Sequence, residues 1–458
     1  MKIDKQADFE NESLGFCEID QGFGIREAIE EAKRCLNCKN PLCRKGCPIE
    51  NDIPQFIQAL AHGNIGEAGV IISKRSNLPA VCGRVCPHEQ QCEGSCILNA
   101  KKEPIKIGKL ERFIADFEAE MGVTIERPPY KDGDIAVIGA GPAGLTVAGD
   151  LAKMGFSVTV FESQSEPGGV LMYGIPGFRL NREVVRREIR KIEQLGVKFR
   201  TNTLVGQDIT IDEMLEKEFD AVFIGTGTAL PKTLNVPGKE LTGVIQAMYL
   251  LRMVTLANHG DVSDKEIPID QGDRVIVIGA GNVAIDAART ALRLGATSVT
   301  IVYRRTIEEM PALRSEYEHA VKEGVQFSWL SSPVAFLGEE NVQQLQYEVQ
   351  EVDENGKIRG TGNMEIIPAD KIILAIGQRP AARVISTAKG IEVNEEGYVI
   401  TKEYPYGMTT RKGVFAGGDV VHEPATVVLA MKEAKKVAAG IAKYVEAKKL
   451  IEALDKNI

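Results

Sequence analysis

Eight of the nine cysteines form two groups near the start of the chain, at spacings that suit metal ligation. The first group has the pattern Cys-x2-Cys-x4-Cys-x3-Cys and the second has Cys-x3-Cys-x5-Cys-x3-Cys. Thiolates at such short spacings can bind one inorganic centre, and eight of them suit two 4Fe–4S clusters. The candidate ligands are Cys35, Cys38, Cys43, Cys47, Cys82, Cys86, Cys92 and Cys96.

Proline follows both Cys47 and Cys86. A Cys-Pro at the end of such a run resembles bacterial ferredoxins, where the last cysteine serves the other cluster, so we expect the two ligand sets to interleave. Two zinc sites of four cysteines each are the alternative. Zinc has no redox role, whereas the nucleotide-binding patterns downstream favour electron transfer. Cys17 stands apart from both groups and is expected to be a plain thiol.

A glycine-rich turn, Gly139-Ala-Gly141-Pro-Ala-Gly144, has the spacing of a dinucleotide-binding loop. Its glycines permit a tight turn and let a pyrophosphate approach the N–H groups at the start of the next helix. Glu162 ends the following expected strand, where a carboxylate accepts hydrogen bonds from ribose hydroxyls. The combination predicts a dinucleotide site, and the alternative is a glycine turn without a ligand.

A second turn, Gly279-Ala-Gly281-Asn282-Val-Ala284, follows the same pattern, but alanine replaces its last glycine. At the end of the strand after it stand Arg304 and Arg305 instead of an acid. Two guanidinium groups there can neutralise a 2′-phosphate, so this turn is expected to prefer NADP(H) over NAD(H). The alternative is that both arginines are ordinary surface charges.

Both turns need a strand before them and a helix after them, and the sequence supplies these elements. Strands are expected at 135–138 and 157–161 around a helix at 144–154, and again at 274–278 and 298–303 around a helix at 284–294. Residues 413–443 read as a strand, a turn and a long helix that complete the first fold. The chain before about residue 129 reads as mostly helical, for example at 25–33 and 107–121. We therefore expect an α/β protein with a helical iron–sulfur domain (1–130), an FAD-binding domain in two parts (131–240 and 376–458) and an inserted NADP(H)-binding domain (241–375).

The composition is that of an ordinary globular protein of 458 residues, 44% apolar and 26% charged. A net charge of −9 argues against a binder of duplex nucleic acid. No apolar run is long enough to span a membrane, and the polar N-terminus lacks the apolar core of a secretory signal. We therefore expect a cytoplasmic protein, in which the cysteines bind metal and do not form a disulfide scaffold.

The cysteine groups, both glycine turns with Glu162, the stretch Gly168-Gly-Val-Leu-Met-Tyr-Gly-Ile-Pro and the motif Gly417-Gly-Asp together resemble the small (beta) subunit family of NADPH-dependent glutamate synthase. The resemblance covers essentially the whole chain. The module also looks like the large subunit of the electron-bifurcating NADH-dependent ferredoxin:NADP oxidoreductase, and like part of dihydropyrimidine dehydrogenase. The resemblance implies contacts to FAD from Gly139, Gly141, Gly144, Glu162, Gly169, Gly418 and Asp419, and contacts to NADP(H) from Gly279, Gly281, Asn282, Arg304 and Arg305.

The resemblance also implies how two 4Fe–4S clusters share the cysteines. One cluster takes Cys35, Cys38, Cys43 and Cys96, and the other takes Cys47, Cys86, Cys92 and a ligand that is not cysteine. Glu111 occupies the matching place for that last ligand, and its alternative role is a carboxylate on a helix surface. Cys82 is then a spectator or a rival ligand.

These cofactors imply an electron relay. NADPH gives two electrons as a hydride and a cluster accepts one at a time, so a flavin, which can do both, must lie between them. We expect the nicotinamide near the flavin at the interface of the two nucleotide-binding folds. The hydride step needs no acid–base pair, and the sequence shows none. The sequence therefore predicts no catalytic residue. His422, after the Gly-Gly-Asp turn, is expected to be a loop residue.

The electrons must leave to another polypeptide. A glutaminase needs a nucleophile, typically an N-terminal cysteine, whereas this chain begins Met1-Lys2-Ile3, so we expect no synthesis of glutamate from glutamine by this chain alone. The expected partner is a glutamate synthase large subunit, or a ferredoxin-reductase-like flavoprotein if the chain belongs to a bifurcating enzyme. Self-association is a further alternative, and a zinc-binding, nucleotide-sensing scaffold without turnover is a third hypothesis.

Overall fold

The computed structural model describes residues 15–122, 126–381 and 387–455, so the start Met1-Lys2-Ile3 lies outside the described residues. Two compact units emerge. The smaller unit contains residues 15–19, Tyr173–Phe178 and Pro231–Ile376, and the larger unit contains the rest of the described chain. Among the described residues, no helix is both long and apolar enough to cross a membrane.

The larger unit contains a five-stranded parallel sheet in the order β15-β4-β1-β2-β3. Its central strands are buried apolar runs, which is typical of parallel sheets covered on both faces. The strand β15 pairs with β4, which confirms that the C-terminal segment completes the first nucleotide-binding fold. The strands are β1 (Asp134–Ile138), β2 (Ser157–Phe161), β3 (Lys198–Arg200), β4 (Ala221–Ile224) and β15 (Val414–Ala416).

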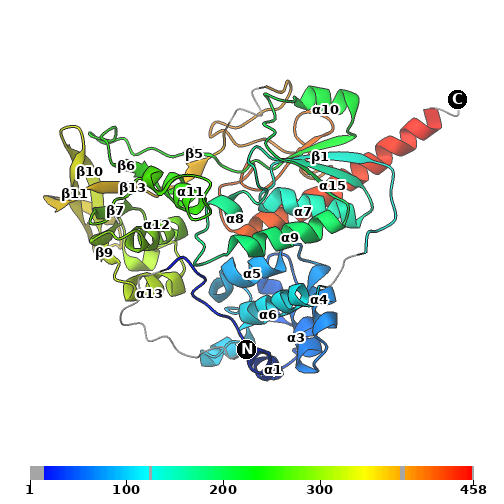
Figure 1. Cartoon of the computed structure of the whole chain (residues 1–458), viewed down its shortest axis with the longest axis horizontal. Coiled ribbons are helices and arrows are strands. Elements are labelled where there is room, and N and C mark those ends of the chain that lie inside the picture. Colours follow the sequence, from blue (N-terminus) through cyan, green and yellow to red (C-terminus); the bar gives the residue numbers. More distant parts are fainter. Residues whose placement is uncertain (1–14, 123–125, 382–386, 456–458) are drawn as a thin grey trace. The chain divides into compact units, whose positions relative to one another are not determined.

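Helices flank this sheet. Figure 1 shows α7 and α15 side by side, and the two helices pack along each other. The predicted strands and the helix after the first glycine turn are confirmed, although α7 begins two residues before the expected start and α15 extends well past residue 443. The helices are α7 (Pro142–Lys153), α8 (Val170–Tyr173), α9 (Arg182–Gln194), α10 (Ile211–Lys217) and α15 (Val427–Asp455).

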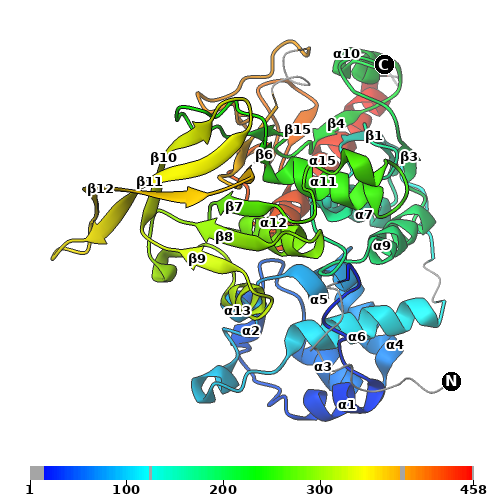
Figure 2. The same cartoon turned by 60° about the vertical axis from the view of Figure 1, so that its left-hand side comes forward.

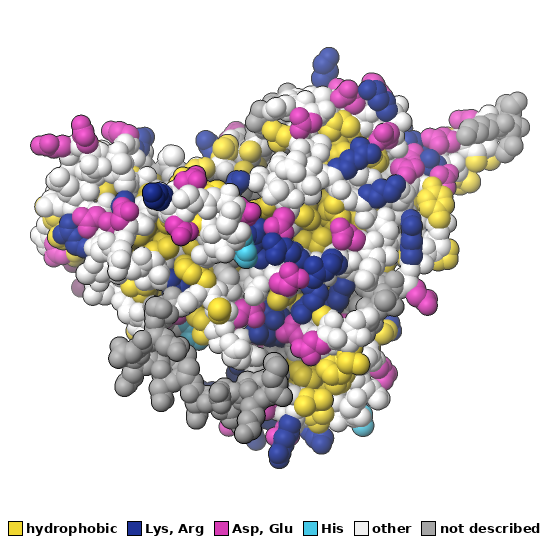
Figure 3. Space-filling model, viewed as in Figure 1, with side chains coloured by type: hydrophobic (Ala, Val, Ile, Leu, Met, Phe, Trp, Pro, Cys, Tyr) yellow, Lys and Arg dark blue, Asp and Glu magenta, His cyan; other side chains and the backbone are white. Residues whose placement is uncertain are grey.

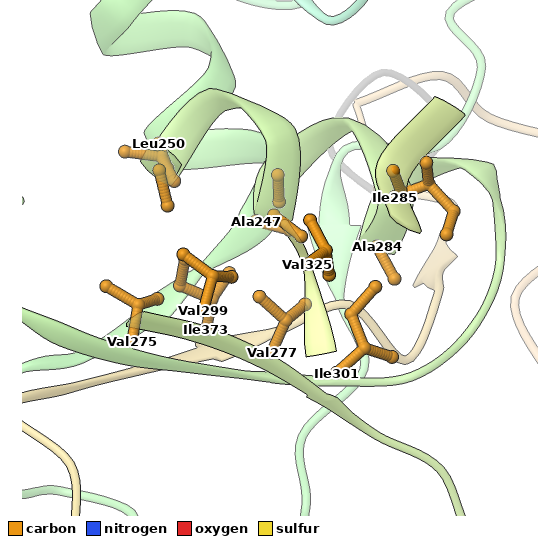
Figure 4. Packing of buried hydrophobic residues seen from close by; sticks show 14 of the residues in the cluster. Ala247, Leu250, Val275, Val277, Ala284, Ile285, Val299, Ile301, Val325 and Ile373 are labelled. Atoms are coloured by element: carbon orange, nitrogen blue, oxygen red, sulfur yellow. The ribbon is translucent and has the colours of Figure 1, made fainter. Parts of the chain in front are cut away.

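The smaller unit holds a second five-stranded parallel sheet, in the order β6-β13-β7-β8-β9. Figure 4 shows its core, where side chains of the strands, such as Val277 and Ile301, meet Ala284 and Ile285 of the helix after the second glycine turn. The elements are β6 (Val244–Gln246), α11 (Ala247–Ala257), η3 (Asp264–Glu266), β7 (Arg274–Ile278), α12 (Asn282–Arg293), β8 (Ser298–Val302), η4 (Ile307–Glu309), α13 (Arg314–Lys322), β9 (Gln326–Ser328) and β13 (Lys371–Leu374).

An antiparallel sheet, β10-β11-β12, follows β9 and was not predicted. Figure 2 shows its long strands beside β7 and β8. Most residues of β12 are exposed, so this strand lacks the alternation of buried and exposed side chains that identifies a strand from sequence. The strands are β10 (Ser331–Gly338), β11 (Val342–Val352) and β12 (Ile358–Pro368), and the chain crosses between the units at the short strands β5 (Leu230–Pro231) and β14 (Gln378–Arg379).

The cysteine-containing part of the larger unit is helical, as predicted. Its helices surround one apolar cluster that includes Phe56, Leu60 and Leu110. Residues 126–133, between these helices and β1, contain no helix and no strand. The helices are α1 (Ile25–Lys33), α2 (Leu42–Gly46), α3 (Ile53–Ala61), α4 (Ile65–Ser73), α5 (Pro79–Val85), η1 (His88–Gln90), η2 (Ile97–Lys101) and α6 (Ile107–Glu120).

Candidate cofactor sites

The first glycine turn bends tightly between β1 and α7. Gly139 has a φ of 94°, which favours glycine, and a Cβ atom on Gly144 would lie 1.9 Å from the carbonyl oxygen of Gly139. In contrast, no atom lies within 4 Å of a Cβ atom on Gly141. This open space lies at the N-terminus of α7, where backbone N–H groups attract anions. The turn therefore fits a pyrophosphate.

The carboxylate of Glu162 lies against this turn. It is buried, and its Oε2 accepts a 2.9 Å hydrogen bond from the backbone N–H of Ala140. Its Oε1 accepts from the backbone N–H of Gln164 at 2.9 Å and from the Ser163 hydroxyl at 3.2 Å. Carboxylate oxygens accept several hydrogen bonds at once, so Glu162 can brace the turn and still accept from a ribose hydroxyl.

The loop after Glu162 returns to the same turn. The backbone N–H of Gly168 donates to the carbonyl of Ala140 at 2.9 Å. Gly169 has a φ of 54°, and a Cβ atom on it would lie 2.9 Å from the Cα of Gly141. Glycine at this position therefore allows close contact between two backbone segments beside the open space.

The Gly-Gly-Asp motif lies on the other side of the start of α7. A Cβ atom on Gly418 would lie 2.8 Å from the Cβ of Ala143. Burial raises the pKa of Asp419 to about 6, and the opposing charge of His422 is a smaller effect. His422 itself is exposed, with its Nε2 3.3 Å from Glu433, which agrees with a loop residue. The structure thus brings Gly418 and Asp419 to the same helix N-terminus as the glycine turn.

The second glycine turn repeats this geometry in the smaller unit. Gly279 has a φ of 121°, and a Cβ atom there would lie 2.4 Å from the carbonyl oxygen of Ala375. A Cβ atom on Gly281 would again meet no atom within 4 Å, at the N-terminus of α12. The side chain of Asn282 accepts a 3.1 Å hydrogen bond from the backbone N–H of Leu313, so it fastens a following loop to the turn.

The two arginines after β8 are exposed and differ in their partners. Arg305 lies 3.9 Å from Glu309, and Arg304 makes no ion pair with another described residue. The backbone of Tyr303, just before them, is paired with Ser328 of β9 and anchors the pair to the sheet edge. A phosphate at this edge would find Arg304 available for bidentate hydrogen bonds.

Four cysteines line a cavity of about 170 Å³ in the larger unit, which we call the first cavity. They come from the loop before α2, from α2 itself and from the start of η2. Leu36, Leu42 and Ile97 also line it, and all three are exposed. The lining cysteines are Cys35, Cys38, Cys43 and Cys96.

Four other cysteines line a second cavity, together with Glu111 and His88. Glu111 is buried on α6, and burial, with a smaller effect of the Glu188 charge, raises its pKa to about 8. Val428 of α15 lies on the wall of this cavity. The lining cysteines are Cys47, Cys82, Cys86 and Cys92.

The two cavities are neighbours. Ile53 and Ile107 line both of them, so their side chains form the partition. The second cavity faces α15, which follows the Gly-Gly-Asp motif, and the first cavity faces the exposed residues Leu36 and Ile97. The arrangement therefore runs from the flavin-type fold, through two sulfur-lined cavities, to the protein surface.

The thiols that line the two cavities are partly or fully buried. Burial raises the pKa of Cys43 and of Cys47 to about 11, and burial also raises the pKa of Cys92. A hydrogen bond to Cys82, followed by burial, raises the pKa of Cys86. Thiols with such pKa values stay protonated until a metal centre displaces the protons.

Cys82 differs from the other cysteines of the second cavity in its contacts. Its Sγ lies 3.6 Å from the Sδ of Met431 and 3.9 Å from the Oγ of Ser76. These contacts hold the Cys82 side chain between α5 and α15. Cys82 also shares a hydrogen bond with Cys86, so its contacts fit both a spectator and a rival ligand.

The sequence analysis missed His88. Burial lowers its pKa to about 4, and its buried Nε2 has no hydrogen-bond partner in the part of the chain that the structure describes. A Cβ atom on Gly108 would lie 2.4 Å from the imidazole ring, so α6 packs directly on it. The signal in the sequence was its place directly after Cys86-Pro87, next to a candidate ligand.

A site for a single zinc ion would need a different arrangement of donors from the one that the two cavities show. Zinc binds four donors that converge at about 2.3 Å for sulfur. In residues 15–122, 126–381 and 387–455, no group of three or more His, Cys, Asp or Glu side chains is arranged to hold one metal ion. The sulfurs instead line cavities of about 170 Å³ and about 20 Å³.

An ion-pair network joins the cysteine-containing helices to the helix α9. Asp116 of α6 lies 2.8 Å from Arg84 of α5, pairs with Arg187 of α9 and lies 3.5 Å from Arg112. Figure 3 shows Lys and Arg side chains gathered over α6 and α9, with acidic side chains among them. This network positions the cysteine helices on the flavin-type fold.

Two protein-family models match successive parts of the chain. Residues 12–123 match the family described as dihydropyrimidine dehydrogenase domain II, 4Fe-4S cluster, and residues 133–434 match the pyridine nucleotide-disulphide oxidoreductases. The chain is 38% identical over 443 residues to the small chain of the NADPH glutamate synthase of Halomonas elongata, covering 94% of this chain and 93% of that protein. It is 37% identical over 447 residues to the Escherichia coli small chain, covering 94% of each.

A solved structure supports the fold. FprA from Mycobacterium tuberculosis, in a mutant form, superimposes with a TM-score of 0.58 at 21% identity, covering 70% of this chain and 86% of that one. At this identity the likeness concerns the fold alone. It agrees with the predicted α/β architecture of paired nucleotide-binding folds.

Proposed function

Because the chain belongs to the family of the small chain of NADPH-dependent glutamate synthase, we propose that it is the electron-input subunit of a glutamate synthase. In this role the chain is an NADPH-dependent oxidoreductase that holds FAD and 4Fe–4S centres. A bound flavin supplies the link between a two-electron hydride donor and acceptors of single electrons.

The two glycine turns would bind the two nucleotides. In the larger unit, the open space beside Gly141 would take the pyrophosphate of FAD, and Glu162 would accept from its ribose. Asp419, beside the same helix, would contact the ribityl or phosphate portion. In the smaller unit, Gly281 would lie beside the pyrophosphate of NADPH and Arg304 beside its 2′-phosphate.

The cysteine cavities would hold the clusters. We assign Cys35, Cys38, Cys43 and Cys96 to one 4Fe–4S centre, in the first cavity. The second cavity would hold the other centre, with Glu111 as the ligand that is not cysteine. Glu111 supports this role by its buried position opposite the thiols. The cysteine ligands there would be Cys47, Cys86 and Cys92.

The order of the sites carries the proposal. Val428 on α15 lines the second cavity, Ile53 and Ile107 separate the two cavities, and Leu36 lies at the surface beside the first. Electron transfer slows steeply with distance, so neighbouring centres in this order suit a chain of single-electron steps. Buried apolar side chains between the centres also exclude water from the path.

Anaerobic preparation of the chain tests this function directly. We expect about eight iron atoms and as many acid-labile sulfides per chain, one FAD, and bleaching of the visible spectrum on addition of NADPH. A preparation that binds FAD but contains no iron would overturn the proposal. With glutamine and 2-oxoglutarate, the chain alone should form no glutamate, and addition of a large subunit should start the reaction.

The partner distinguishes a glutamate synthase from a bifurcating enzyme. Mass spectrometry of the complex from a native extract should identify a large chain with a glutaminase domain. A ferredoxin-reductase-like flavoprotein in its place would show that the same electron relay serves a bifurcating oxidoreductase.

A further inference from the structure

The imidazole of His88 has a buried nitrogen without a partner. His88 lines the second cavity and follows Cys86-Pro87 directly in the chain. Its Nε2 is buried and makes no hydrogen bond to any residue that the structure describes. Buried polar side-chain atoms in folded proteins nearly always have a partner. An unpartnered ring nitrogen on a cysteine-lined cavity therefore indicates a ligand that the cavity takes up.

The other ring nitrogen of His88 is already engaged. The ring makes a hydrogen bond to the backbone of Cys82, and this bond uses Nδ1 because Nε2 has no partner. The N–H of Cys82 donates to the carbonyl of Leu78 at 2.9 Å, so the Cys82 carbonyl is the acceptor and Nδ1 carries the proton. Nε2 then presents a lone pair and no proton. A histidine that binds a metal through one nitrogen almost always fixes the other nitrogen to a carbonyl or a carboxylate in this way.

Gly108 holds the ring without covering this lone pair. A Cβ atom on Gly108 would lie 2.4 Å from Cε1, 2.5 Å from Nε2 and 2.6 Å from Nδ1 of His88. Nearly equal distances to three adjacent ring atoms place Gly108 over the face of the ring, whereas the Nε2 lone pair lies in the ring plane. Glu111 follows Gly108 by three residues on α6, so both residues lie on one face of that helix. The imidazole therefore packs on the helix face that carries the Glu111 carboxylate.

We propose that His88 binds, through Nε2, the same iron of the second 4Fe–4S centre that Glu111 binds. The proposal rests on the proposed function, because it needs a cluster in the second cavity. Three cysteines there bind three of the four irons, and the fourth iron accepts nitrogen and oxygen ligands. Thiols and the Glu111 carboxyl could donate a proton to Nε2 in the empty cavity, but they give up these protons when they bind iron. The lone pair of Nε2 then has iron as its only partner in the cavity.

Pulsed electron paramagnetic resonance tests the bond directly. The holoprotein is prepared anaerobically from histidine with ¹⁵N in the imidazole ring, frozen, and reduced by irradiation in the frozen state, so that each cluster takes up an electron whatever its potential. The measured quantity is the magnetic coupling between the cluster spin and ¹⁵N. We expect the strong coupling of a directly bound nitrogen in the parent protein. The variant His88→Phe should lose it, because phenylalanine keeps a ring on Gly108 but has no nitrogen.

A converse variant assigns the coupling without any change at His88. The other four histidines of the chain are exposed, namely His62, His259, His319 and His422. The variant His62→Gln/His259→Gln/His319→Gln/His422→Gln leaves His88 as the only labelled ring. It should keep its iron and should show the coupling at full size.

Retention of the fourth iron is a second readout. When ferricyanide oxidises a 4Fe–4S cluster, it takes up one electron, one Fe²⁺ leaves, and a three-iron cluster remains. The iron that no cysteine binds is the one released, and a second protein ligand should retain it. After brief ferricyanide treatment the parent and the control His62→Gln should keep about eight irons per chain, whereas His88→Phe should keep about seven and show the resonance of a three-iron cluster.

Two results would overturn His88 as a ligand while the proposed function stands. One is a parent protein with about eight irons that bleaches with NADPH but shows no strong ¹⁵N coupling. The other is a coupling that persists in His88→Phe or disappears from the variant that lacks the other four histidines. A parent protein without iron would instead refute the proposed function itself.

Discussion

The carboxylate of Glu162 accepts a 2.9 Å hydrogen bond from the backbone N–H of Ala140, and this contact fixes the acid at the end of β2 to the middle of the first glycine turn. The parallel register of β1 and β2 brings the two together, because Ile138 lies opposite Phe161 and each strand ends at the same sheet edge. One side chain thus braces the loop and lies where a ribose would bind.

Replacement of that acid should weaken FAD binding without unfolding the chain. In Glu162→Gln the one remaining carbonyl oxygen can accept from Ala140, but the amide NH2 cannot accept from the backbone N–H of Gln164. The charge that strengthens hydrogen bonds to ribose is also lost, so we expect an affinity for FAD about tenfold lower. Flavin release on dilution, followed by fluorescence, measures this. Glu120→Gln, at an exposed position on α6, is the control and should leave retention unchanged. Equal retention by both variants would contradict the role of Glu162.

Two alanine substitutions in the same turn should have different effects, one on FAD binding and the other on the stability of the fold. Gly141→Ala places a methyl group in open space, so the protein should fold normally but bind FAD at least about tenfold more weakly. Gly144→Ala forces a methyl group against the carbonyl of Gly139, so it should destabilise the fold itself by about 1–3 kcal/mol. Denaturant unfolding and flavin content distinguish the two outcomes, and full FAD binding by Gly141→Ala would refute the predicted pyrophosphate position.

The choice between NADPH and NADH should depend on Arg304, at the edge of the second nucleotide-binding fold. Arg304→Ser removes the unpaired guanidinium, so the KM for NADPH should rise about tenfold or more while the KM for NADH stays nearly constant. Arg305→Ser should have a smaller effect, because Arg305 lies near Glu309. Steady-state rates with an artificial dye as acceptor give both constants. A parallel rise for both nucleotides would show that Arg304 does not read the 2′-phosphate.

Iron content should distinguish the cysteines of the second cavity. Cys86→Ser should lose about half of the iron, because it removes a proposed ligand of one of two clusters. Cys82→Ser should keep its iron, because Cys82 lies between Met431 and Ser76. Iron analysis and low-temperature electron paramagnetic resonance of reduced protein provide the two readouts. Loss of iron from Cys82→Ser with retention in Glu111→Ala would make Cys82 the fourth ligand.

Acid should loosen the contact between the cysteine helices and α9. Burial alone would raise the pKa of the Asp116 carboxyl. Hydrogen bonds and charges from Arg84 and Arg187 outweigh burial and hold this pKa below its usual value. The ion pairs of Asp116 therefore stabilise the fold fully when the pH is above the ordinary pKa of an aspartate. This stabilisation is lost as the pH falls through the lowered pKa of Asp116 in the folded protein. Asp116→Asn should cost about 2 kcal/mol near neutral pH and should reduce the acid dependence of unfolding. Holoprotein unfolding measured in denaturant at several pH values checks both effects, and an unchanged acid dependence would contradict them.

Short stretches of sequence were enough to predict the strands and turns of the two nucleotide-binding folds. Strands such as Arg274–Ile278 were predicted with their observed bounds, because buried apolar runs next to glycine turns carry their own signature. Gly139, Gly141 and Gly144 could likewise be placed in one tight turn, since their spacing reflects backbone constraints within it. The exposed strand β12 was missed because its pairing depends on β11, and nothing in its own sequence marks a buried face.

The cysteine spacing by itself determined that sulfur-bound centres belong to the leading segment, and the glycine turns determined two nucleotide-binding folds. The spacing did not decide which thiols share a cavity. The structure places Cys96 with Cys35, Cys38 and Cys43, and Cys47 with Cys82, Cys86 and Cys92. Tertiary structure also decided that His88 lies on the second cavity and that exposed residues such as Leu36 and Ile97 line the first. These relations depend on how α3, α5 and α6 pack around one apolar core, and contacts between residues far apart in sequence follow from that packing and not from local periodicity.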